Sequence, residues 1–89
     1  MPERTISIRN QLGFHARAAS RFVDLASSFR SRIEIRMNGV AVDGKSILGI
    51  LTLAAPCGAS VRLVAEGLDA EEALDRLVEL IERRFGEEH

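Results

Sequence analysis

Hydrophobic and polar side chains alternate in three short segments of this chain. They are residues 5–9 (TISIR), residues 32–37 (RIEIRM) and residues 60–66 (SVRLVAE). Successive side chains of a β-strand point to opposite faces, so this spacing predicts strands with one buried face. Asn38-Gly39 follows the second segment, and both residues tolerate the positive φ angles of a two-residue hairpin turn. We therefore expect a further strand at residues 40–42.

Three other segments have the spacing of an amphipathic helix. After Gly13, apolar residues recur every three to four positions, at Ala18, Ala19, Phe22, Val23, Ala26 and Phe29. The run ILGILTLAA follows DGKS, in which the Ser46 hydroxyl is suited to cap a second helix. In the last segment, Asp69 precedes Glu72 by three positions, as in a capping box. One long helix is expected there, with an apolar stripe of Ala73, Leu74, Leu77, Val78, Ile81 and Phe85.

The predicted order is strand, helix, strand, strand, helix, strand, helix, and no linker or repeat divides it. This order (βαββαβα) predicts one α+β domain over residues 1–89. We expect an open-faced sandwich, in which three helices cover one face of a four-stranded antiparallel sheet. The other face is polar, because Arg32, Glu34, Arg36 and Arg62 have to point to water.

Composition and charge exclude several classes of function. Apolar residues make up 46% of the 89 positions and the formal net charge is −1, which suits a globular protein but not nucleic-acid binding. No apolar run is long enough to cross a membrane and MPERTISIRN lacks a signal segment, so we expect a cytoplasmic protein without membrane insertion. Cys57 is the single cysteine, and His15 and His89 lie far apart, so we expect no disulfide, metal or cofactor.

The stretch LGFHARAAS, residues 12–20, contains the best candidate chemistry. If a helix begins at Ala16, the amides of Ala16, Arg17 and Ala18 lack helical partners and form an anion site together with the helix dipole. His15 lies at the edge of that site, and Arg17 can bring a permanent positive charge over it. A histidine ring nitrogen is nucleophilic when neutral, so this arrangement provides a phosphoryl acceptor beside a phosphate cradle.

The spacing alone leaves three hypotheses open. No acidic residue within LGFHARAAS can orient the ring or activate water, although a distant one can approach in the fold, so carrying phosphate is favoured over hydrolysing it. A small phosphatase is the second hypothesis, because a cradle at a helix start also suits acyl phosphate hydrolysis. A pure interaction module, in which His15 is an ordinary capping residue, is the third.

GFHARAA, followed about thirty positions later by GKSILGIL, closely resembles the HPr family, the histidine-containing phosphocarriers of the bacterial phosphoenolpyruvate-dependent phosphotransferase system. The likeness spans essentially the whole chain. It implies that His15 takes a phosphoryl group from phospho-enzyme I, on the ring nitrogen nearer the backbone, and passes it to the histidine of an enzyme IIA-type acceptor. Arg17 aligns with the family's site arginine. The resemblance thus implies a phosphoryl carrier with a phosphohistidine intermediate and not an enzyme that turns over alone.

Ser46 aligns with the serine that a dedicated kinase/phosphorylase modifies in some bacteria. A regulatory module controlled through Ser46 is therefore the alternative to a carrier in sugar uptake or in a regulatory branch of the system. The chain departs from the family pattern at Ala18, where the motif usually has proline.

The helix after Ser46 is apolar on nearly all sides, which predicts an exposed docking patch. We expect a monomer. The residues expected to contact its partners are Ser20, Arg21, Ile47, Leu48 and Leu51.

Overall fold

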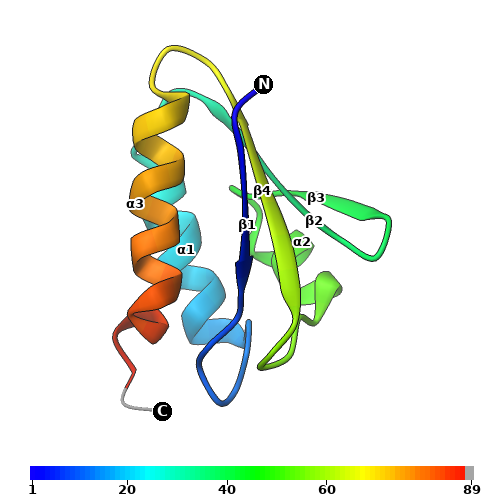
Figure 1. The fold of residues 1–89 in the computed structure, drawn as a ribbon. Helices are drawn as coiled ribbons and strands as arrows, with labels where there is room; N and C mark the ends of the chain where they lie inside the picture. The colour runs from blue at the N-terminus through cyan, green and yellow to red at the C-terminus, as the bar shows by residue number, and fades with distance from the viewer. Residues whose placement is uncertain (88–89) are drawn as a thin grey trace.

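The elements of the computed structural model, which describes residues 1–87, follow the order expected from the sequence. They are β1 (Glu3–Ser7), α1 (Ala16–Ser27), β2 (Arg32–Met37), β3 (Val40–Asp43), α2 (Ile47–Leu53), β4 (Ser60–Glu66), α3 (Ala70–Glu82) and the 3₁₀ turn η1 (Arg84–Gly86). The strands form one antiparallel sheet in the order β1-β4-β2-β3 (Figure 1). The predicted α+β open-faced sandwich is confirmed.

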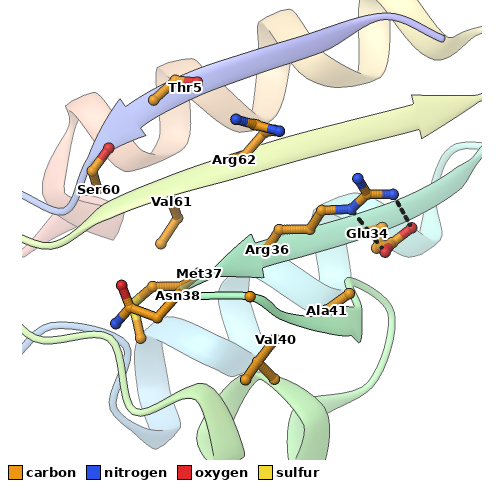
Figure 2. Close-up of a pocket in the computed structure, with 11 residues that line it drawn as sticks. Thr5, Glu34, Arg36, Met37, Asn38, Val40, Ala41, Ser60, Val61 and Arg62 are labelled. Carbon is orange, nitrogen blue, oxygen red and sulfur yellow. Dashed lines mark hydrogen bonds and ion pairs between the residues drawn. The ribbon is translucent and has the colours of Figure 1, made fainter.

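The alternation along the strands separates an apolar face of the sheet from a polar one. Ile35 lies opposite Leu63 and both are fully buried in the core beneath the helices. One position along, Arg36 lies opposite Arg62 on the other face. Figure 2 shows this face, where Arg36 donates to both oxygens of Glu34 at 3.0 and 3.4 Å. Period-two spacing therefore selects which side of the sheet the helices cover.

Two local predictions are confirmed in the segment that joins β2 to α2. Asn38 and Gly39 both have positive φ, 51° and 81°, as the two central residues of this hairpin turn require. At the start of α2 the Ser46 Oγ accepts a hydrogen bond from the Gly49 amide at 3.1 Å. Ser46 is therefore the N-cap of this helix, as its sequence position predicts.

The capping box predicted at Asp69 is wrong. Asp69 does occupy the N-cap position of α3, but its carboxylate makes no bond to the helix. It accepts hydrogen bonds from the Arg30 and Ser31 amides, each at 2.9 Å, and from the Ser31 hydroxyl. The side chain therefore joins the turn between α1 and β2 to the start of α3. The partner is a turn distant in sequence, which a local motif cannot reveal.

The last helix is shorter than its apolar stripe predicts. It ends at Glu82, and Arg84, Phe85 and Gly86 follow with φ angles of 57°, 56° and 80°. This left-handed turn still buries Phe85, whose ring centroid lies 5.1 Å from that of Phe14. Phe85 is buried, as the apolar stripe predicts, but its backbone is not helical. The turn redirects the C-terminal segment toward the start of α1 (Figure 1).

Within residues 1–87, no helix is both long and apolar enough to cross a membrane. His89, which the sequence gives no reason to assign as a metal ligand, lies outside the described residues.

The contacts of Asp69 predict an acid-sensitive contribution to stability. Hydrogen bonds from the Ser31 side chain and the Arg30 amide lower the pKa of Asp69 below its ordinary value of 3.8. A carboxyl with a lowered folded-state pKa stabilises the fold above its unfolded pKa, and this contribution disappears as pH falls through the folded pKa. We expect Asp69→Asn to lower the urea midpoint of unfolding at neutral pH. Between about pH 4 and pH 2, the urea midpoint should decrease less in Asp69→Asn than in the wild-type protein.

Asp24→Asn is the matched control for Asp69→Asn, since Asp24 is an exposed residue of α1. If the urea midpoints of Asp69→Asn and the wild-type protein depend equally on pH, the acid-sensitive contribution does not come from Asp69.

The C-terminal end of α2 predicts a stabilising substitution. Ala54 follows the helix in the left-handed conformation, with φ 52° and ψ 40°, where a Cβ atom is unfavourable and glycine is common. Ala54→Gly is expected to raise the free energy of unfolding by about 0.5–1 kcal/mol in a urea titration. Ala41→Gly, the same change at an exposed strand position, should lower it instead. Destabilisation by both variants would contradict the left-handed cap.

Candidate functional site

A tight turn precedes α1 and is held by a buried side-chain amide. Asn10 is fully buried, and its Nδ2 donates to the Gly13 carbonyl at 2.7 Å. Gly13 has a φ of 65°, and a Cβ atom there would lie 2.4 Å from the Ala55 carbonyl oxygen and 2.9 Å from the Pro56 Cα. Phe14 completes this junction by donating its amide to the same Ala55 carbonyl at 2.9 Å. Only glycine fits here, and the close packing sets the position of the residues that follow.

His15 is the N-cap of α1, which begins at Ala16 as the sequence predicts. Its ring Nδ1 accepts a hydrogen bond from the Arg17 amide at 3.3 Å, and its carbonyl accepts from Ala19 at 2.8 Å. The amides of Ala16 and Ala18 have no backbone partner among residues 1–87. The ring nitrogen nearer the backbone therefore faces the positive end of a helix, where unpaired amides favour an anion.

Arg17 and Ala18 occupy different environments in the first turn of α1. Arg17 is exposed, so its guanidinium can move over the amides that begin the helix. Ala18 is fully buried and contributes its side chain to the core. The predicted phosphate-binding set thus combines one exposed cation with backbone groups fixed by packing.

Glu87 is the site residue that sequence reasoning missed. Its Oε2 lies 2.9 Å from the Nε2 of His15, and its Oε1 accepts from the Nδ2 of Asn10 at 2.8 Å. The His15 and Glu87 side chains are 26% and 16% exposed. The available sequence signal was Gly86, because glycine just after a helical pattern is a stop signal. Gly86 as a stop signal predicts an earlier end of the last helix. It does not predict which side chain the following residue, Glu87, approaches.

The predicted docking residues are not equally available to a partner. Leu48 is 77% and Ile47 40% exposed, whereas Ser20 and Leu51 are half-buried. The guanidinium of Arg21 already donates to the Phe85 carbonyl. Leu12, which is 69% exposed, is a further apolar side chain on the loop before His15.

The larger surface features lie apart from His15. A hollow of about 550 Å³ opens on the polar face of the sheet, and its lining includes Thr5, Arg36 and Arg62 but none of the site residues (Figure 2). Among residues 1–87, no group of three His, Cys, Asp or Glu side chains is placed to hold a metal ion. Cys57 is exposed.

Comparisons with known proteins agree with the motifs and the fold. The family described as "PTS HPr component phosphorylation site" matches residues 2–83. The chain is 46% identical to the phosphocarrier protein HPr of Cupriavidus necator over 87 residues, with 98% of each chain covered. It is also 46% identical to that of Pseudomonas aeruginosa over 88 residues, again with 98% of each covered.

Among solved structures, the chain is similar to HPr from Thermoanaerobacter tengcongensis. The two share 49% sequence identity and a TM-score of 0.96, with 100% of each chain covered. With a histidine-capped helix, a second helix capped by serine and full-length relatives, the chain belongs to the HPr family of phosphocarrier proteins of the phosphotransferase system.

Proposed function

We propose that this chain accepts a phosphoryl group on the Nδ1 of His15 from phospho-enzyme I and passes it to the histidine of an enzyme IIA-type protein. The observation that carries the proposal is the direction of Nδ1, which accepts from the Arg17 amide at the start of α1. A phosphoryl group on this nitrogen would lie where the first-turn amides and the Arg17 guanidinium can bind its oxygens. Phosphoryl transfer depends mainly on such positioning and charge compensation.

The contacts of Glu87 favour carrying over hydrolysis. A hydrolase needs a base that is free to take a proton from water. Glu87 brings the acidic residue that LGFHARAAS lacks, but one of its oxygens contacts His15 and the other contacts Asn10. Because both oxygens are engaged, this carboxylate supports the ring and is not placed as a base for water.

We assign partner docking to the exposed apolar side chains of α2 and the adjoining face of α1. Ile47 and Leu48 are the exposed members, Leu51 and Ser20 are half-buried, and Arg21 also donates to the Phe85 carbonyl. The proposed partners are enzyme I and enzyme IIA-type proteins. We propose that the chain binds them as a monomer in the cytoplasm.

Regulation through Ser46 is the second candidate function. Ser46 caps α2 directly before the exposed Ile47 and Leu48. A phosphate at a helix start is tolerated by the helix dipole, so its effect would be to add negative charge next to an apolar docking surface. A kinase/phosphorylase would be the partner for this modification.

The carrier function predicts a single labile phosphate on each chain. On mixing with enzyme I and phosphoenolpyruvate, the wild-type protein should gain one phosphate that is stable to base and lost in acid, as a phosphohistidine is. Intact-mass spectrometry should show no gain in His15→Ala. Ser46→Ala is the control and should be labelled fully, because Ser46 caps a different helix.

Labelling of His15→Ala equal to that of the wild-type protein would refute the carrier proposal. Multiple turnovers on an acyl phosphate without partner proteins would favour the phosphatase instead.

The alanine at position 18 predicts a modest effect when the family's usual proline is restored. Ala18 is the third residue of α1 and its amide has no backbone partner among residues 1–87, so proline breaks no helical hydrogen bond. We expect Ala18→Pro to change the transfer rate from enzyme I by less than about tenfold in a quenched-flow assay. Complete loss of transfer in a folded variant would mean that the Ala18 amide is an essential phosphate ligand.

A further inference from the structure

The C-terminal turn places a carboxylate on the edge of the His15 ring that faces away from α1. Oε2 of Glu87 lies 2.9 Å from Nε2, while Nδ1 accepts from the Arg17 amide. The two ring nitrogens therefore have different neighbours, an amide donor on one side and a carboxylate on the other. Glu87 supports the ring from the side opposite the proposed phosphate site and does not occupy that site.

The position of Glu87 is fixed by the core and by a turn of unusual backbone geometry. The Phe85 side chain is 1% exposed and packs against Phe14, while Arg21 donates to the Phe85 carbonyl. The Gly86 and Glu87 amides donate to the Arg83 and Arg84 carbonyls at 3.0 and 2.9 Å.

The bond from Asn10 fixes the remaining freedom of the Glu87 carboxylate. The Nδ2 of Asn10 donates to Glu87 and to the Gly13 carbonyl, and both of these partners are acceptors. The amide orientation therefore follows from chemistry, since the reversed orientation would set an oxygen against two oxygens. One buried side chain thus joins the turn before α1 to the tail.

These contacts determine the tautomer of His15. The Arg17 amide can only donate, so Nδ1 has to present its lone pair. A neutral imidazole then carries its single proton on Nε2, and the ionised Glu87 carboxylate, which can only accept, receives this N–H. The two partners are mutually consistent, and together they make Nδ1 the nucleophilic atom.

We propose that Glu87, held by Asn10, is a positioning residue that keeps the proton of His15 on Nε2 and stabilises the phosphorylated ring. This proposal rests on the carrier function proposed above. In the accepting step, the Nδ1 lone pair forms the new N–P bond, and the electrons of the old N–P bond return to the histidine of the donor. The His15 ring retains its Nε2 proton and becomes positively charged, beside the negative charge of Glu87.

In the donating step the same proton makes the ring a good leaving group. The electrons of the N–P bond return to Nδ1 when the acceptor histidine attacks phosphorus. A neutral imidazole leaves, because Nε2 already carries a proton and none has to be supplied. Without that proton the leaving group would be an imidazolate anion, which is a much poorer one.

Glu87→Gln tests the proposal because glutamine has the same shape, but one of its two terminal atoms is an acceptor and the other is a donor. If its NH₂ group faces Asn10, it meets the donor Nδ2 of that residue. If the NH₂ group faces His15, either two donors meet at Nε2 or the ring proton moves to Nδ1. We expect the ¹⁵N shifts of the His15 ring to identify a protonated Nε2 in the wild-type protein. In Glu87→Gln the two shifts should move toward each other. These shifts report the proton position, which a purely structural role of Glu87 would not change.

Transfer kinetics provide the second measurement. We expect Glu87→Gln to slow phosphoryl transfer from enzyme I about tenfold, because a charge-assisted hydrogen bond is about twice as strong as a neutral one. The transfer rate of Glu87→Asp should lie between those of the wild-type protein and Glu87→Gln, since the carboxylate is kept on a shorter side chain. Glu82→Gln, the same loss of charge at the exposed end of α3, is the matched control and should transfer at the wild-type rate. Circular dichroism of each variant checks that the fold is intact.

The two proposals fail in different ways. Wild-type nitrogen shifts together with a wild-type transfer rate in Glu87→Gln would overturn the role of Glu87 and leave the carrier function standing. Equal slowing in Glu87→Asp and Glu87→Gln, with unchanged nitrogen shifts, would also overturn it. If the wild-type protein accepts no phosphate at all, the carrier proposal is wrong, and the nitrogen shifts alone then decide whether Glu87 sets the tautomer.

Discussion

The hydrogen bonds of the Asn10 amide connect two ends of the chain that both approach His15. One bond closes the turn at Gly13 and the other holds Glu87, and the amide itself is fully buried. The buried Nδ2 group has to find acceptors within the protein, because leaving it unpaired costs free energy, whereas the Oδ1 of the same side chain is buried without a partner among residues 1–87. The position of His15 therefore depends on a side chain that takes no part in the chemistry. The ring is supported on one edge by the start of α1 and on the other by the tail.

The charges of the molecule are distributed so that His15 keeps the positive environment of a helix start. The first turn of α1 contains no acidic residue, and the nearby carboxylate of Glu87 contacts Nε2, the nitrogen that does not face the helix. On the polar face of the sheet, Arg36 is paired with Glu34 and Arg62 with Glu3. Surface pairs of this kind contribute little to stability. They do balance these arginines locally, whereas Arg17 is exposed at the start of α1 and is available to the phosphate that we propose on His15.

Local rules succeeded at two turns where the decisive partners are close in sequence. Ser46 reaches an amide three residues away, and Asn38 and Gly39 form their turn with their own backbone. The same rules failed where the partner is distant. Asp69 has the spacing of a capping box, but its carboxylate bonds to Arg30 and Ser31. Its oxygens obtain three donors in that turn, and the start of α3 has no side-chain cap.

By itself the sequence determined the order of the elements, the buried face of β2 and β4 and the start of α1 at Ala16, and it singled out His15 as the candidate residue. Periodicity and capping depend on residues within a few positions of one another, so they can be read from one segment at a time. Only the tertiary structure decided that Phe85 enters the core from a left-handed turn and that Glu87 thereby reaches His15. The burial of Phe85 and the hydrogen bond that its carbonyl accepts from Arg21 together offset the unfavourable backbone of that turn, and such a balance depends on the space left by the packed helices and sheet.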